Sequence, residues 1–440
     1  MSTDMKTNLP CSANILRKQF SNGVTVLVHE NPWSSTAAVC GSLFAGSCLE
    51  IADKFGLASF VSAALTMGTQ SRDFMQISEY LESIGASLSF GRGPHTIHFK
   101  GNCLCEDLAD LLRLLKEILD EPAFPERYVE IIRQRALKGF TLDSDDPDDS
   151  AWERFKNLLW MGDHPYGRRE YGSKEIIRNI TRNDLVEFHR RFFGPKKLIL
   201  AIAGGFRGQE IMDRCEDIFG NWEKSQEDPD EDALFPEPYK HETCVLGHVK
   251  IIGSRETTLT IGTFGPAADD PDVMSARLGN YILGEDNLLS RVGYTVREKH
   301  GLAYSVYSSV DPLKKSGSWS VSASVDPADL EEAGALIFDE LRRFILEPVS
   351  QKELEDAKAC YLGGMPLGFA ANADKAFGMH SLAYYQQDLD HFLRLHQLVD
   401  AVTPETVLET ARKWIDPGKM IIVTAGPDDD FKDGSCWWHK

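Results

Sequence analysis

The chain lacks any excess of basic residues and any long hydrophobic run. Its 440 residues include 47 Lys and Arg against 67 Asp and Glu, which gives a formal net charge of -20. Proteins that bind nucleic acid or an anionic membrane are expected to carry a basic surface, so this composition argues against both partners. No apolar stretch approaches the roughly 18 residues that a membrane-spanning helix needs. We therefore expect no spanning segment.

The chain also lacks the marks of a secreted protein. Its first twenty residues contain no apolar run of about 7 to 15 residues and no small-residue cleavage site, as a signal peptide would. Nine cysteines, an odd number scattered from Cys11 to Cys436, fit reduced thiols better than a disulfide framework. The C-x-C pair of Cys103 and Cys105 has no matching His or Cys pair at zinc-finger spacing. We expect a cytoplasmic protein in which this pair belongs to a strand.

What the chain does contain is an internal repeat. The run DLADLLRLLKEILDEP matches ADLEEAGALIFDELRRFILEP, so that Leu108 corresponds to Leu330, and Pro195 corresponds to Pro417 further on. Both pairs are 222 positions apart. A chain of this length is too long for one ordinary core. The constant register predicts two copies of one domain.

Each copy shows the same mixture of strands and helices. In the first copy, β-branched or alternating runs predict strands near 24–30, 37–44, 95–102 and 198–204. Helices are expected at 56–67, 74–84, 106–120, 126–142, 150–160 and 182–192. Without regular strand-helix-strand alternation, we predict an α+β fold in which each domain is a mixed, largely antiparallel sheet covered by helices.

The domain limits follow from the repeat and from one change of composition. Residues 225–243 are acidic and rich in proline, which is typical of an extended linker. We predict an N-terminal domain over 14–224, a C-terminal domain over 244–428 and a tail over 429–440. The two Trp of the tail are expected to dock either on a partner or on the body of the chain.

The segment GLASFVSAALTMGT, residues 56–69, reads as an amphipathic helix. Leu57, Phe60, Val61, Ala64 and Leu65 recur at the spacing of a buried helical stripe. The opposite face holds only small, uncharged side chains. On these residues alone the segment is an ordinary core helix without a metal.

The chain as a whole resembles the pitrilysin/insulinase family of zinc peptidases, in particular the type of the mitochondrial processing peptidase. The resemblance is carried by the order and spacing of several segments, among them SNGVTVLVHE, GLASF through GT, DDPDDSAWERFKNLLWMGDHPYGRREYGS, ITRNDLVEFHRRFFGPKKLILAIAGGF and LGEDNLLSRVGYTVREKHGLAYSVYSS. It implies two homologous α+β domains, in agreement with the repeat.

The resemblance also implies a zinc site that this sequence has lost. Active members read GLAHFLEHMxxxGT where this chain has Ser59, Ser62 and Ala63 in place of the two His and the Glu. The family's third ligand, a later Glu, falls at Lys138 and Gly139. Hydrolytic zinc needs three protein ligands, an open water position and a base. We therefore expect no metal or other cofactor in this chain.

Three histidines are candidate substitutes for the missing ligands. His95 and His98 are three apart on an expected strand, so their side chains should point to opposite faces. His164 matches a turn of the family that is usually structural. We expect none of them to hold zinc.

The second half keeps residues that the first half has lost. LLSRVGYTVREKH predicts a helix with Leu288, Leu289, Val292 and Val296 inward, ending at Gly301 as a C-terminal cap. The strand LAYSVYS follows.

Across this turn, Arg297 and Tyr304 should come close in space. The family resemblance implies that they hold the substrate carbonyl, a role for which a guanidinium and a phenol are suitable donors. The alternative is structural: Arg297 would pair with Glu298 or Glu285, and Tyr304 would fill a core gap.

Some peptidases of the family divide the site between two similar chains. The leading hypothesis is that this chain is the non-zinc subunit of a heterodimeric metallopeptidase, inactive alone. Arg297 and Tyr304 would complete the zinc site of a homologous partner that acts on unfolded peptides. The alternatives are a catalytically inactive structural or assembly subunit and a stand-alone enzyme with unfamiliar chemistry. The acidic run 143–150 is expected to be a capped turn between helices.

Overall fold

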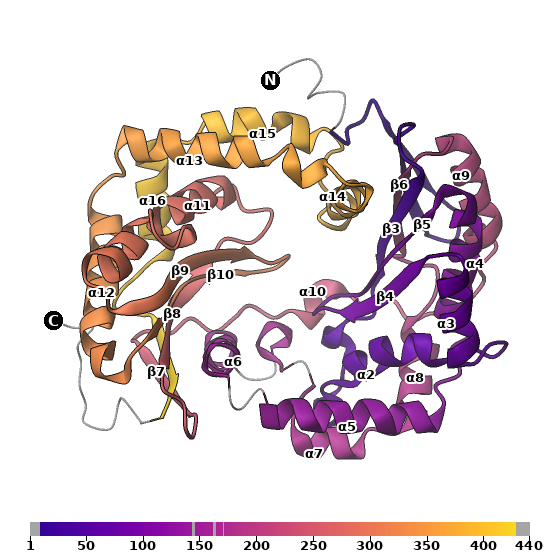
Figure 1. The fold of residues 1–440 in the computed structure, drawn as a ribbon, viewed down its shortest axis with the longest axis horizontal. Coiled ribbons are helices and arrows are strands. Elements are labelled where there is room, and N and C mark those ends of the chain that lie inside the picture. The colour runs from indigo at the N-terminus through magenta and orange to yellow at the C-terminus, as the bar shows by residue number, and fades with distance from the viewer. Residues whose placement is uncertain (1–8, 143–145, 162–163, 170, 428–440) are drawn as a thin grey trace. The chain divides into compact units, whose positions relative to one another are not determined.

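The computed structural model describes residues 9–142, 146–161, 164–169 and 171–427. The expected tail therefore lies outside the described residues. The chain forms two compact units, each built on one sheet (Figure 1). Unit 1 comprises residues 1–138, 169–235 and 365–394, and unit 2 comprises 139–168, 236–364 and 395–440. Within the described residues, no helix is long and apolar enough to cross a bilayer.

The sheet of unit 1 has six strands in the order β1-β2-β6-β3-β5-β4. Neighbouring strands are antiparallel except for the parallel pair β2 and β6. The strands span Ile15–Gln19 (β1), Thr25–Glu30 (β2), Thr36–Leu43 (β3), Ser87–Arg92 (β4), Ile97–Leu104 (β5) and Ile199–Gly204 (β6).

Helices of unit 1 cover this sheet on both faces (Figure 1). The unit contains α2 (Leu57–Ala64), α3 (Phe74–Ser83), α4 (Leu108–Asp120), most of α5 (Glu126–Leu142), α7 (Lys174–Asn179), α8 (Arg182–Phe192), α9 (Gly208–Cys215), α10 (Glu231–Leu234) and α14 (Asn372–Tyr384), with a π-helical turn η7 at Glu216–Gly220. Short 3-10 turns lie at Ser47–Leu49 (η1), Ala52–Lys54 (η2), Leu65–Met67 (η3), Cys105–Asp107 (η4) and Leu367–Phe369 (η11).

The sheet of unit 2 has five strands in the order β7-β11-β8-β10-β9. Only the pair β7 and β11 is parallel. The strands span Val245–Lys250 (β7), Thr257–Gly265 (β8), Ala303–Pro312 (β9), Gly317–Val325 (β10) and Ile421–Gly426 (β11). In both units the sheet is mixed and largely antiparallel, so the predicted α+β fold is confirmed.

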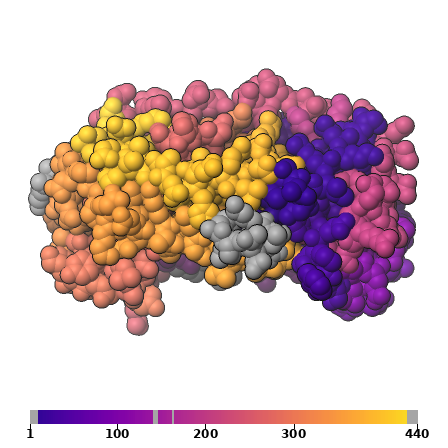
Figure 2. Space-filling model, turned by 90° about the horizontal axis from the view of Figure 1, so that it is seen from above, coloured from indigo at the N-terminus to yellow at the C-terminus, as the bar shows by residue number. Residues whose placement is uncertain are grey.

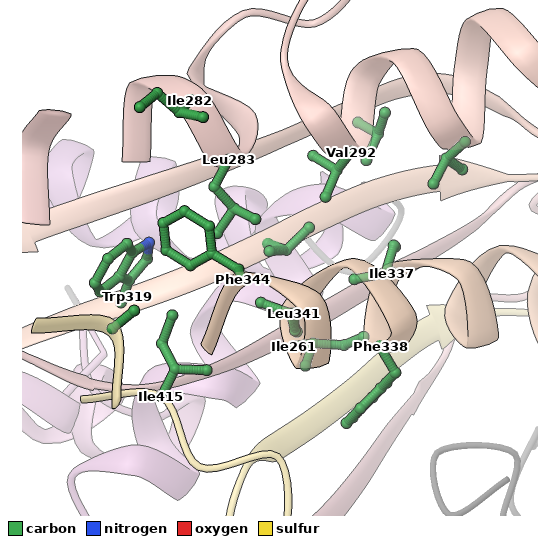
Figure 3. Close-up of a cluster of buried hydrophobic side chains, with 14 of the residues drawn as sticks. Ile261, Ile282, Leu283, Val292, Trp319, Ile337, Phe338, Leu341, Phe344 and Ile415 are labelled. Atoms are coloured by element: carbon green, nitrogen blue, oxygen red, sulfur yellow. The ribbon is translucent and has the colours of Figure 1, made fainter. Parts of the chain in front are cut away.

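One face of the second sheet packs against a large apolar cluster. Trp319 of β10 and Phe344 of the long helix α12 meet edge to face with their ring centroids 6.0 Å apart (Figure 3). The helices of this unit are α6 (Pro147–Leu159), α11 (Val273–Asn280), α12 (Leu330–Leu346), α13 (Gln351–Gly364), most of α15 (His391–Asp400) and α16 (Pro404–Trp414). Two π-helical segments, η8 (Tyr281–Glu285) and η9 (Gly293–Lys299), and the turns η6 (Pro165–Gly167) and η10 (Pro327–Asp329) complete it. In the space-filling view, its surface is formed largely by the later segments of the chain, in orange and yellow (Figure 2).

Two helices at equivalent places in the repeat pack on the sheet of the other copy. Helix α6, from the first copy, packs on β7, β8 and β11, where its Phe155 lies against Gly262. Helix α14, from the second copy, packs on β2, β3 and β6 through Ala376, Met379 and Leu382. Each unit therefore takes its sheet from one copy of the repeat and one covering helix from the other.

Candidate functional site

Helix α2 carries the positions where the family resemblance implied zinc ligands. Its apolar stripe is buried as predicted, with Phe60 and Val61 fully enclosed. Ser59 and Ser62 are buried as well. The Ser62 hydroxyl donates back to the Ser59 carbonyl at 3.0 Å, and the Nε of Arg92 donates to the Ser59 Oγ at 3.0 Å.

The chemistry of these positions does not fit zinc. Neither a serine hydroxyl nor the Ala63 methyl supplies the imidazole, thiolate or carboxylate that zinc takes from proteins. Lys138 is exposed on α5, and Gly139 follows it without a side chain. Among the described residues, no group of three or more His, Cys, Asp or Glu could hold a metal ion. No catalytic step can be assigned to a metal held by these residues.

The other histidines and cysteines are separated by the fold. His95 is buried ahead of β5 and its Nδ1 lies 2.6 Å from Glu231 Oε1, whereas His98 lies within β5 and is exposed. His164 accepts a hydrogen bond from the Tyr166 backbone N-H at 3.2 Å, which is the structural turn predicted for it. Cys103 ends a buried row of β5. The expectation that His95 and His98 share a strand was wrong, because β5 begins at Ile97, after His95.

Arg297 and Tyr304 lie at the junction of η9 and the edge strand β9. Gly301 adopts φ +69°, and its N-H donates to the Arg297 carbonyl at 3.0 Å, so the predicted glycine cap is confirmed. The Arg297 side chain is half-buried, while Tyr304 is 79% exposed. Within the described residues, neither side chain makes a hydrogen bond or a salt bridge. The structural alternative required an ion pair for Arg297 and a core position for Tyr304, and neither is found.

The helix prediction was wrong at the start of this segment. Val292 and Val296 are buried as expected, but Leu288 and Leu289 are exposed and lie in a turn before the helix. The Oδ1 of Asp286 accepts both of their backbone N-H groups, at 2.8 and 2.7 Å. This local side-chain bond competes with helix formation and moves the helix start to about residue 291.

One ion pair and one further hydrogen bond hold η9 and the residues just before it from one side. Arg291 donates two bonds to Glu353 of α13, at 2.8 and 3.0 Å, and Thr295 donates to Glu340 of α12 at 2.9 Å. Burial by itself would raise the pKa of Glu353, but hydrogen bonds from Arg291 and Ser350 lower it to about 2. Residues 291 and 295 are one turn apart, so η9 is fixed through one face.

Asparagine side chains hold the edge strand β9. The Asn287 Oδ1 accepts the Val306 backbone N-H of β9 at 2.9 Å. Further along β9, the Ser308 hydroxyl donates to the Asn280 Oδ1 at 2.7 Å, and the Trp319 indole donates to the same oxygen at 3.1 Å. The unpaired Arg297 and Tyr304 are thus carried by a well-supported turn. These supporting residues were missed because nothing in the local sequence marks a side chain that bonds to a distant backbone.

Arg92 was also missed, since the sequence analysis assigned no strand to Ser87–Arg92. The alternation of Ser87, Leu88, Ser89 and Phe90 is the signal that could have found β4. It is short and is bounded by glycines, which favours a loop assignment.

Two models of one protein family match separate parts of this chain. "Insulinase (Peptidase family M16)" matches residues 25–150, and "Peptidase M16 inactive domain" matches residues 179–360. The chain belongs to the peptidase M16 (insulinase) family. The family expected from the sequence motifs is therefore confirmed.

Relatives of this M16 chain have been named as proteases. An uncharacterized zinc protease of Mycobacterium leprae is 27% identical over 414 residues, covering 92% of this chain and 90% of that protein. One from Rickettsia bellii is 27% identical and covers 77% of this chain and 80% of that protein. A peptidase M16 inactive domain from Pseudomonas fluorescens has a TM-score of 0.87 at 25% identity, covering 94% of this chain and 98% of that one. A Helicobacter pylori protease with a TM-score of 0.84 and 18% identity, covering 95% and 100% of the two chains, shares the fold.

Proposed function

We propose that this M16 chain is the non-zinc subunit of a heterodimeric metallopeptidase. The observation that carries the proposal is the pair Arg297 and Tyr304, two hydrogen-bond donors that find no partner among the described residues although their turn is well supported. A side chain that only stabilises the fold is expected to be buried or paired. Ser59, Ser62 and Ala63 supply neither zinc ligands nor a base, which supports a division of the active site between this chain and another.

In this role the two donors act on the substrate carbonyl. The guanidinium of Arg297 and the phenol of Tyr304 would donate to the carbonyl oxygen as it gains negative charge during attack. Neither needs to be displaced from a protein acceptor beforehand, so little reorganisation is required. Zinc and the base would be supplied by a homologous partner chain, and the substrate would be an unfolded peptide.

Reconstitution tests the proposal. The chain alone should cut no peptide, and mixing it with a zinc-bearing homologue of similar length should give peptidase activity. Arg297→Ala should lower kcat/KM of the mixture by about 100-fold or more, since removing one oxyanion donor typically has this effect. Arg277→Ala, at an exposed arginine of α11 that contacts the Tyr361 hydroxyl, is the matched control.

Tyrosine variants extend the test. Tyr304→Phe removes one hydroxyl and should lower kcat/KM by a comparable factor, while Tyr239→Phe, at another exposed tyrosine, should leave it unchanged. If the Arg297→Ala mixture cleaves peptide at the normal rate, the assigned role is wrong.

A second candidate is a catalytically inactive structural or assembly subunit. Large exposed apolar side chains favour it, namely Trp33, Ile252 and Leu289, each of them mostly exposed. A stable complex with a homologue that shows the same peptidase activity with or without this chain would support this role instead.

A further inference from the structure

Arg92 ends the edge strand β4 beside the uncharged face of α2. Its Nε donates to the Ser59 Oγ at 3.0 Å, and α2 packs against β4. The side chain is half-buried, and both neighbours in the chain, Gly91 and Gly93, lack side chains that could cover it. The terminal nitrogens of the guanidinium make no hydrogen bond with the described residues.

Among the described residues, no carboxylate forms a salt bridge with Arg92. The carboxylate of Glu50, which follows η1, instead accepts the Ala58 backbone N-H at 2.7 Å through its Oε1. His98 and Lys100 lie on β5 opposite Gly91 and Ser89, so their side chains project from the sheet face opposite to that of Arg92. The terminal nitrogens of Arg92 are therefore left for an acceptor that the described residues do not supply.

We infer that Arg92 is the anchor of a binding site for a peptide carboxylate, either the C-terminal carboxylate or an Asp or Glu side chain. A guanidinium fixed through Nε keeps its two NH2 groups for a planar two-oxygen acceptor, the geometry that carboxylates supply. The site rests on the proposed handling of peptides, but it lies in unit 1 and involves neither Arg297 nor Tyr304.

Calorimetric titration of the purified full-length chain with three synthetic peptides tests the site. The peptides share one unfolded sequence without Asp or Glu: one has a free C-terminal carboxylate, one has a C-terminal amide, and one has the amide plus a single internal Asp. At least one carboxylate-bearing peptide should bind about tenfold tighter than the plain amide, as expected for a charge-assisted pair. Whether the free acid or the Asp peptide gains affinity identifies the source of the carboxylate.

Variants assign this preference to Arg92. Arg92→Gln should abolish it, and Arg92→Lys should keep part of it because the charge remains while the planar fork is lost. Arg113→Gln, at an exposed arginine of α4 that pairs with Asp110, should keep all of it. The inference is overturned if the unmodified chain binds the three peptides equally or not at all, or if folded Arg92→Gln keeps the preference. This experiment needs no partner chain. Its failure would therefore not affect the outcome of the reconstitution test with Arg297→Ala.

Discussion

The two sheets carry the same helix-helix-edge strand arrangement with different chemistry. In unit 1, α2 and α3 precede the six-residue edge strand β4, and in unit 2, α11 with η8 and then η9 precede the ten-residue edge strand β9. In the first arrangement Ser59 and Ser62, the positions at which the family resemblance implied ligands, are buried and bonded within the unit. In the second, Arg297 and Tyr304 have no partner in the part of the chain that the structure describes.

The difference lies in how each arrangement is supported. In unit 1, a regular α-helix directs its small residues inward, where an arginine from the edge strand reaches them. In unit 2, π-helical turns replace regular helix at η8 and η9, and such turns are frequent at functional sites. Side chains from α12, α13 and the preceding turn hold η9 and β9, so the two donors need no bonds of their own. The two arrangements therefore differ in structural support by other residues and not in exposure alone.

The largest expected difference between the two units is in their stability at acidic pH. Unit 1 contains His29, His189 and His380, whose pKa values are each lowered to about 4, mainly by burial. Secondary causes are Lys375 for His29, Lys224 for His189 and His98 for His380. Between pH 6.5 and 4 the unfolded chain takes up these protons and the folded chain does not. Stability is therefore lost as pH falls through this window, by up to about 3 kcal/mol per histidine.

Hydrogen exchange at pH 7 and pH 5 measures this loss segment by segment. Amides of β2, β3 and β6 should lose protection at pH 5 before those of β8 and β10. His380→Gln, which can still bond to the Ser42 Oγ now 2.7 Å from His380 Nε2, should reduce the pH dependence of unit 1. Equal loss of protection in both sheets would contradict the prediction.

A smaller loss of stability is expected from an alanine substitution at Gly293 of η9. A Cβ on Gly293 would lie 2.7 Å from the backbone C and O of Asn287, atoms that cannot move without disturbing the turn. Gly293→Ala should lower the free energy of unfolding by about 2 kcal/mol through overpacking, measured by urea denaturation. The matched control is Gly363→Ala in α13, where a Cβ meets no atom within 4 Å. That change should be neutral or slightly stabilising, and equal stability of the two variants would show that the turn is less constrained than described.

Loss of the ion pair between Arg291 and Glu353, which holds η9, should lower the free energy of unfolding by a still smaller, pH-dependent amount. The lowered pKa of Glu353, about 2, means that its stabilisation is present above its unfolded pKa and is lost as pH falls from about 4.5 toward 2. The group is one-third exposed, so after allowance for solvent screening the effect is about 1 to 2 kcal/mol. Glu353→Gln should lose this amount at neutral pH and little at pH 2, as measured by urea denaturation at each pH. An unchanged difference between pH 7 and pH 2 would assign the loss to packing instead.

Many helices, caps and strands could be predicted because each is determined by residues close together in the sequence. The stripe of α2 and the cap at Gly301 follow from spacing and from the need for positive φ. Periodicity shows that a helix buries one face but not which sheet it packs on, so the exchange of α6 and α14 between copies was not predictable. Likewise, residue types identified Ser59 as a poor ligand, but only the tertiary structure brings Arg92, 33 residues later, against it.

The smallest expected effect on stability distinguishes a functional role of Tyr304 from a structural one. Tyr304→Phe removes a hydroxyl that is exposed and unpaired, so the free energy of unfolding should change by less than about 0.5 kcal/mol. Ser59→Ala instead removes a buried acceptor of Arg92 and should cost about 1 kcal/mol. If urea denaturation shows that Tyr304→Phe destabilises the chain as much as Ser59→Ala does, then Tyr304 is a structural residue. If its stability is unchanged while the reconstituted activity falls, the residue is retained for a substrate and not for the fold, which is the distinction that separates the two sheets.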